Sequence, residues 1–212
     1  MKKKKQIKPL GVILGLITLI SLGLNVYLAG RVNRSNNFPE TFRVTKVFDG
    51  DSFSIPPDQT IRLAKLDAPE IELCFGQEAK LNLEKLILNQ DVKIEKAGKD
   101  SFNRTIAFVY LDNQSVNETL IKNGWAKYAS GGTEQENKEV TELLKTEGER
   151  DKEKQLGVWG PNCYQKTNTA NPGCDIKGNL GKHEHGEKKT YHYPGCSEYD
   201  RTIVELDLGE QW

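Results

Sequence analysis

The sequence predicts an α+β fold, in which a five-stranded OB-type β-barrel with three helices follows one transmembrane helix and precedes a small α/β appendage. Three observations predict it. Short alternating apolar runs separated by turn residues indicate strands at 42–47, 51–55 and 59–66, and a helical pattern and two more strands follow. An apolar run near the N-terminus has the ~20 residues that span a bilayer. Beyond Trp159 the composition changes. Three strands, a helix, two strands and further helices is the order expected of an OB barrel.

The N-terminal segment has the composition of a membrane anchor. Residues 1–9 carry five lysines and no acidic residue, and residues 10–30 are apolar except mainly for Asn25. We expect a basic cytoplasmic tail at 1–9, a transmembrane anchor at 10–30 and a linker at 31–39, because lysines mark the end that stays in the cytoplasm. A cleaved signal peptide and a secreted product are the alternative, since the segment ends in the small residues Ala29 and Gly30. Both interpretations predict that the rest of the chain, from residue 31 on, lies outside the cytoplasm.

Residues 40–161 are expected to form the barrel domain. Its further elements are a helix at 76–88, strands at 91–95 and 105–111, a helix that opens with the capping box Ser115–Glu118 and ends at Gly124, and a charged helix at 133–154. The first of these helices places Ala79, Leu83, Leu86 and Ile87 on one face. That face should pack on the sheet.

Carboxylates and an arginine gather at the predicted strand ends. The Asp49–Ser52 segment contains Asp-Gly between two alternating apolar runs, which predicts a tight turn. Pro69 biases Ala68 toward extended geometry, so the third strand should stop there and leave Glu70 at its edge. With Arg62 on the same strand, this is the composition of a hard-cation site that faces a phosphate.

Several fragments occur in a fixed order: Phe48-Asp49-Gly50-Asp51-Ser52, Ile61-Arg62-Leu63, Leu66-Asp67-Ala68-Pro69-Glu70, Gly76-Gln77-Glu78-Ala79, Asp100-Ser101-Phe102-Asn103-Arg104, Val116-Asn117-Glu118, Gly124-Trp125-Ala126 and Leu156-Gly157-Val158-Trp159. In this order they resemble the thermonuclease (micrococcal nuclease-like) family over about residues 40 to 160. The resemblance implies an OB fold and a monomeric nuclease. Its substrates would be DNA and RNA, single-stranded or locally open, and its products would carry 3′-phosphates.

The resemblance also implies roles for particular residues. Asp51 and Asp67 would be carboxylate ligands of Ca²⁺, and Ala68, where many relatives carry Thr, would supply a backbone carbonyl. Glu70 would be the general base for the attacking water. Arg62 and Arg104 would hold the non-bridging phosphate oxygens. Asp49 is either a partner of the metal ligands or a simple turn aspartate.

Substrate contacts are less well marked. Phe102 and Tyr128 are the candidates for base stacking, with core packing as the alternative for Tyr128. Ser101-Phe102 stands where relatives often have Lys-Tyr, and Ser130-Gly131-Gly132 replaces an aromatic-bearing loop. These departures bear on affinity and sequence preference rather than on the chemistry.

The charge balance is unusual for a nucleic-acid-binding protein. Residues 1–34 hold seven of the 30 basic residues and no acid, so the rest of the chain has 23 basic and 30 acidic residues, a formal net charge of −7. A general nucleic-acid binder is normally basic. We therefore expect substrate binding to depend on local charge, on the metal and on salt concentration.

The C-terminal part divides into a linker at 162–173 and a small module at 174–212. The module resembles one often appended to thermonuclease domains, itself similar to the metal-binding domain of methylphosphotriester-DNA repair proteins. All three histidines lie between Cys174 and Cys196, but the spacing matches no familiar zinc ligand set. Disulfides are expected in an exported chain. Four cysteines allow three pairings, of which Cys174–Cys196 with Cys74–Cys163 is our first choice. The chain stops within a strand-like run, so we expect a truncated module.

Two function classes follow from these patterns. One is a membrane-anchored, Ca²⁺-dependent nuclease; the other is a surface OB module that binds nucleic acid or protein without cutting it. The presence of Asp51, Arg62, Asp67, Glu70 and Arg104 together favours the enzyme. The sequence Asn103-Arg104-Thr105 is a glycosylation sequon on a catalytic candidate, which favours a bacterial cell surface.

Overall fold

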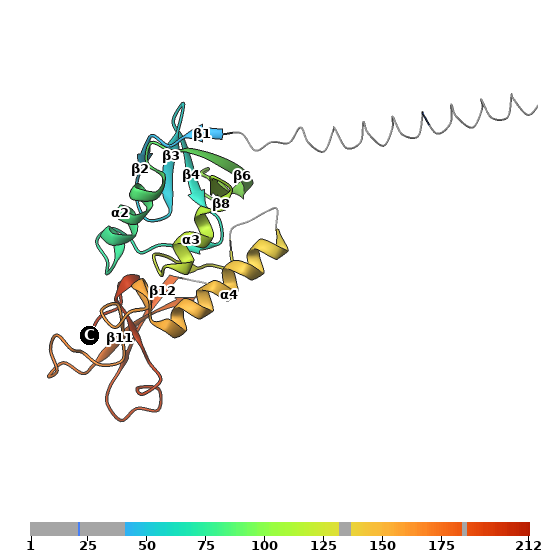
Figure 1. The fold of residues 1–212 in the computed structure, drawn as a ribbon. Coiled ribbons are helices and arrows are strands. Elements are labelled where there is room, and N and C mark those ends of the chain that lie inside the picture. The colour runs from blue at the N-terminus through green and yellow to red at the C-terminus, as the bar shows by residue number, and fades with distance from the viewer. Residues whose placement is uncertain (1–20, 22–40, 132–136, 184–185) are drawn as a thin grey trace, which may run out of the picture. The chain divides into compact units, whose positions relative to one another are not determined.

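The computed structural model describes residue 21 and residues 41–131, 137–183 and 186–212 (Figure 1). The chain divides into two compact units, Met1–Pro39 and Glu40–Trp212. The expected anchor at 10–30 lies outside the described residues except for Ser21. None of the helices formed by described residues is both long enough and apolar enough to cross a membrane.

One large sheet organises the second unit. Its strands follow the order β1 (Thr41–Arg43), β6 (Asp91–Lys99), β7 (Thr105–Leu111), β4 (Gln59–Leu63), β3 (Ser52–Ile55) and β2 (Lys46–Val47), with β8 (Gln114–Ser115) beside β7 (Figure 1). The pairing of β4 with β7 is parallel, and the other pairings are antiparallel. The parallel pair brings the sequence around residue 62 next to the sequence around residue 105.

We expected a five-stranded OB-type barrel, and the structure shows no closed barrel among the described residues. Its hydrogen-bonded order has two ends, β1 and β2, which are consecutive pieces of one extended segment. Between them, Val44 N donates to Gln90 O (2.9 Å) and Thr45 N donates to Ser54 O (3.0 Å). The predicted strand at 42–47 is divided because it changes partner at this point. The segment 41–47 thus supplies both end strands of the sheet, and this requires the sheet to curve.

Three α-helices accompany the sheet in the described part of the second unit: α2 (Gly76–Ile87), α3 (Val116–Lys122) and α4 (Lys138–Lys154). α2 buries Ala79, Leu83 and Ile87, which confirms its predicted apolar face. At the start of α3 the hydroxyl of Ser115 accepts a hydrogen bond from Glu118 N at 3.1 Å, as a capping residue does. The expected start of α4 at residue 133 falls in the segment 132–136, outside the described residues.

The C-terminal module is built from short strands. β10 (Tyr164–Gln165) pairs with β13 (Val204–Glu205), and β11 (Lys177–His183) pairs with β12 (Gly186–His192). The described residues after 154 contain no α-helix, only the 3₁₀ turns η1 (Gly157–Trp159) and η2 (Leu206–Leu208). This differs from the α/β appendage that we expected. The longest regular elements of this part, β11 and β12, pair with each other as an antiparallel hairpin, and turns connect the rest.

One disulfide is present among the described residues. Cys74 and Cys163 are bonded, with an S–S distance of 2.04 Å and Cα atoms 5.6 Å apart. Cys174 and Cys196 are free thiols, so the pairing Cys174–Cys196 that we expected is not formed. Each of these two thiols lies in its own turn, since Cys174 N donates to Asn171 O (2.9 Å) and Cys196 N donates to Tyr193 O (3.1 Å).

Candidate active site

The turn before β3 presents Asp51. Phe48 N donates to Ser52 O (2.9 Å), and the Asp49 carboxylate accepts a hydrogen bond from Asp51 N (2.9 Å). Asp49 therefore makes the hydrogen bond of a turn aspartate, and, besides burial, its charge also contributes to raising the pKa of Asp51. A Cβ atom on Gly50 would lie 2.6 Å from Ala68 Cβ and 2.7 Å from Ala79 Cβ, so only glycine allows this close approach.

Arg62 connects the two aspartates that we expected to bind metal. It lies on β4 directly opposite Ser52 of β3. Its Nη1 atom is 2.6 Å from Asp51 Oδ1, and its Nη2 atom is 2.6 Å from Asp67 Oδ1. The predicted strand at 59–66 is broken at Lys65, whose φ is +60°, so that Asp67 belongs to a separate strand, β5 (Leu66–Asp67). This break lets the two carboxylates converge on one guanidinium group.

Asp51 is a strongly buried carboxylate, with a side chain that is 4% exposed. It accepts hydrogen bonds from Ser52 Oγ (2.7 Å) and Ala68 N (3.2 Å) as well as from Arg62. Burial raises the pKa of Asp51 to about 7, and this effect exceeds the opposing effect of the Arg62 charge. A further cation at this carboxylate would therefore stabilise its ionised form.

Arg104 is oriented by a carboxylate that sequence reasoning did not single out. Asp100 Oδ1 accepts from Phe102 N and Arg104 N, both at 2.9 Å, and Oδ2 accepts from Arg104 Nε at 2.6 Å. On its other side, Arg104 Nη1 is 3.5 Å from Ser52 Oγ. Aspartate commonly bonds the backbone two residues on, and this local pattern is the signal in the sequence that marks Asp100.

The three expected catalytic residues share a cavity. Arg62, Glu70 and Arg104 all line a cavity of about 390 Å³, together with Lys65 and Phe102. Phe102 is 79% exposed, and the Arg104 guanidinium carbon lies 5.5 Å from its ring centroid. The structure thus brings these residues together from β4, from the loop after β5 and from the turn before β7.

Tyr128, the second candidate for base stacking, does not line this cavity. It is half-buried and packs against the hydrophobic core. Its strand β9 (Lys127–Tyr128) pairs with β5, placing Tyr128 opposite Leu66. The structure therefore places Tyr128 in the packing role that was the alternative.

The loop that carries Glu70 is held by its backbone. Leu73 N donates to Glu70 O at 2.9 Å, and Gly76 N donates to Leu73 O at 3.1 Å. A Cβ atom on Gly76 would lie 1.9 Å from Glu70 O, which excludes any other residue at that position without a shift of the loop. The Glu70 carboxylate is thus exposed on a loop with a defined backbone.

The donor set fits a hard cation. Asp51 and Asp67 carboxylates meet at one positively charged partner, and the Ala68 carbonyl belongs to the same short segment. Among the described residues, no group of three or more His, Cys, Asp or Glu side chains is arranged to hold a metal ion. A Ca²⁺ ion at these aspartates would thus depend on backbone, water and phosphate oxygens for its remaining ligands.

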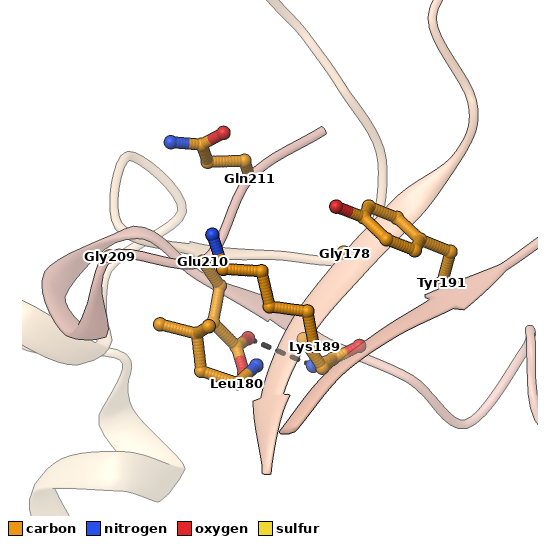
Figure 2. Close-up of a pocket in the computed structure, with 8 residues that line it drawn as sticks. Gly178, Leu180, Lys189, Tyr191, Gly209, Glu210 and Gln211 are labelled. Carbon is orange, nitrogen blue, oxygen red and sulfur yellow. Dashed lines mark hydrogen bonds between the residues drawn. The ribbon is translucent and has the colours of Figure 1, made fainter. Parts of the chain in front are cut away.

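A separate cavity of about 170 Å³ lies in the C-terminal module (Figure 2). Glu210 lies beside it, and its carboxylate accepts hydrogen bonds from Asn179 Nδ2 (2.9 Å), Leu180 N (3.0 Å) and Glu205 N (2.8 Å). These bonds tie the chain end to the β11–β12 hairpin. The Glu210 carboxylate is therefore a structural group.

Known proteins resemble part of this chain. Residues 60–161 match the family model described as staphylococcal nuclease homologue. An uncharacterized endonuclease of Haemophilus influenzae is 36% identical over 114 residues, covering 52% of this chain and 62% of the relative. The thermonuclease of Staphylococcus hyicus is 34% identical over 104 residues, covering 44% and 62%. That of Staphylococcus intermedius is 29% identical over 131 residues, covering 57% and 76%.

Proposed function

We propose, on the premise that residues 60–161 form a domain of the staphylococcal nuclease family, that this chain is a Ca²⁺-dependent nuclease. It would hydrolyse phosphodiester bonds of DNA and RNA, in single strands or locally open duplexes, and leave 3′-phosphates. The observation that carries the proposal is the common cavity of Arg62, Glu70 and Arg104. Two guanidinium groups and a carboxylate around one space are suited to a phosphate and a water.

Each residue would have a distinct task. Arg62 and Arg104 would bind the non-bridging oxygens and stabilise the charge that develops on the phosphoryl group. A guanidinium has five N–H donors, so Arg62 can hold Asp51 and Asp67 and still face a phosphate. Glu70 would take the proton from the attacking water. Ca²⁺, held by Asp51, Asp67 and the Ala68 carbonyl, would supply positive charge for the phosphate.

Digestion of plasmid DNA and of RNA by the full chain tests this proposal. We expect cleavage with Ca²⁺ and none with EGTA. Glu70→Gln and Arg104→Ala should each reduce the rate by about 100-fold or more. The matched controls are Glu72→Gln and Arg43→Ala, which change exposed residues outside the cavity and should cleave like the wild type. Terminal phosphates of the products are identified by phosphatase treatment before end labelling.

The alternative is a surface module that binds nucleic acid or protein without cutting it. The net charge of −7 on residues 35–212 does not favour general binding of nucleic acid. Equal cleavage by the wild type and both cavity variants, or no cleavage by any of them, would reject the nuclease.

We also propose that residues 10–30 anchor the protein in a bacterial membrane as a monomer, with residues 31–212 outside the cytoplasm. The support is the five N-terminal lysines and the apolar run that follows. Cell fractionation tests this: the full chain should stay in the membrane fraction after an alkaline wash, and a chain lacking residues 1–30 should not. Recovery of a shortened product from the medium, with a new N-terminus near residue 31, would instead show signal cleavage.

A further inference from the structure

A third cavity, of about 260 Å³, shares Glu70 with the cavity of Arg62 and Arg104, but its other lining residues are different. One wall is the loop that carries the expected metal ligands and base, residues 67–70 with Leu73. The rest of the lining consists of Lys127 and two residues of the C-terminal module, Asp207 and Leu208. The module therefore reaches the candidate active site.

Several contacts fix the C-terminal wall. Lys127 lies opposite Asp67 in the β5–β9 pair, and its Nζ atom is 2.5 Å from Glu205 Oε2 and 2.6 Å from Asp207 Oδ2. Leu206 N donates to Cys163 O at 2.8 Å, and Cys163 is bonded to Cys74. Asp207 and Leu208 are thus held beside the active-site loop from two directions.

Among the described residues, the lining offers a phosphate no unpaired cation, and its apolar part suits an uncharged group. Asp67, Glu70 and Asp207 contribute three carboxylates, and the single cation, Lys127, is already paired with two carboxylates. The other four lining residues are apolar: Ala68, Pro69, Leu73 and Leu208. The apolar side chain of Leu208 is accessible to a ligand, since this residue is 41% exposed. Apolar surface with hydrogen-bond acceptors at its border suits a base and its sugar.

A scissile phosphodiester always has a nucleoside on each side. With the phosphate at Arg62, Arg104 and Glu70, one nucleoside can lie over the exposed ring of Phe102 in the larger cavity. The nucleoside on the other side of the phosphate must therefore lie outside the part of the cavity next to Phe102. Among the residues that the structure describes, Glu70, the proposed base, is the only one that lines both cavities.

We propose, resting on the nuclease function above, that the cavity between residues 67–73 and Asp207–Leu208 is a second nucleoside subsite. It binds the nucleoside on the side of the scissile phosphate away from Phe102. The C-terminal module is then part of the substrate-binding surface, and Leu208 is a residue that determines specificity.

Steady-state kinetics of Leu208→Ala in the full chain with Ca²⁺ test the subsite. The substrates are a dinucleotide with one scissile phosphodiester and two analogues in which one or the other nucleoside is replaced by a methyl group. Leu208→Ala should lower kcat/KM for the dinucleotide by about fivefold to tenfold, mainly through KM, because apolar contact is lost. The same loss should occur with one methyl ester and be absent with the other. Leu208→Met should restore most of the rate.

The control is Leu81→Ala, which removes a leucine of similar exposure (48%) from α2, outside both cavities. It should leave all three rates at the wild-type level. An equal loss on all three substrates, or no loss on the dinucleotide, would overturn the subsite while the nuclease function stands. If the wild type cleaves neither the dinucleotide nor plasmid DNA, the nuclease function fails, and the subsite with it.

Discussion

The orientation of the Arg104 guanidinium depends on one carboxylate, that of Asp100. Burial raises the pKa of Asp100, but the hydrogen bonds from Arg104 outweigh it and hold the pKa below its ordinary value. The carboxylate is thus ionised near neutral pH, and a charge-assisted bond to Arg104 Nε is stronger than a neutral one. Asp100 is a positioning residue, because it is the closest ionic partner of a proposed phosphate ligand.

Replacement of Asp100 by Asn should therefore weaken catalysis more than stability. The amide keeps the size of the side chain but loses the charge, so Arg104 is held less firmly. We expect kcat/KM to fall by about tenfold, the equivalent of one charge-assisted hydrogen bond, with most of the loss in kcat. Steady-state kinetics and thermal unfolding on the same samples measure both effects.

Asp91→Asn is the matched control, since Asp91 pairs with Arg43 at an exposed site. It should change neither quantity. A drop in thermal midpoint for Asp100→Asn without a change in kcat/KM would contradict the positioning role.

At the scale of elements, α3 is hydrogen-bonded to the sheet through one buried polar side chain, in addition to the apolar residues that it buries in the core. Asn117 is fully buried; its Oδ1 accepts from Val109 N (2.9 Å), and its Nδ2 donates to Ala64 O (2.8 Å) and Ala107 O (3.4 Å). It thereby satisfies backbone groups of β7 and of the bend between β4 and β5. This bend is where the chain turns to place Asp67 beside Arg62.

Asn117→Ala should reduce the free energy of unfolding by about 2–4 kcal/mol, because buried backbone groups are left without partners. Urea-induced unfolding measures this. Asn123→Ala removes an exposed asparagine at the end of the same helix and should cost less than about 1 kcal/mol. Similar losses for the two variants would show that the buried contacts are unimportant.

At the scale of the whole second unit, residues 162–212 are joined to the nuclease-like domain by chemically different links. The Cys74–Cys163 disulfide is covalent, and Lys127 forms ion pairs with Glu205 and Asp207. Cys74 also lies four residues after Glu70, in the loop that carries the proposed base. Stability and activity should therefore both respond to this link.

The double variant Cys74→Ser, Cys163→Ser should lose about 2–4 kcal/mol of unfolding free energy, since the bridge no longer restricts the unfolded chain. Its kcat/KM should also fall, because the Glu70 loop is less restrained. Treatment of the wild type with a thiol reductant should reproduce both changes. The control, Cys174→Ser with Cys196→Ser, removes only free thiols and should change neither. Equal losses in the two double variants would point to a different pairing of the cysteines.

Much of the fold was predictable because its patterns are local. The apolar face of α2 and the Ser115 cap of α3 depend on residues within a few positions of each other. The division of the predicted strand 59–66 at Lys65 was missed. The apolar positions change there from Ile61 and Leu63 to Leu66, which breaks the alternation, but no Gly, Pro, Asn or Asp marks a turn. The role of Asp100 could have been predicted, because an aspartate two residues before Phe102 and four before Arg104 commonly accepts hydrogen bonds from such backbone N–H groups.

The sequence by itself determined the chemistry that is available: the order of the motifs, two guanidinium groups, the carboxylates and the apolar N-terminal run. These are properties of residue type and short-range spacing. Only the tertiary structure decided which of them meet. Arg62, Glu70 and Arg104 line one cavity. Tyr128 packs against the hydrophobic core, and Leu208 lines a cavity together with Glu70. Such contacts join residues far apart in sequence, and they depend on the packing of whole elements, which no local pattern specifies.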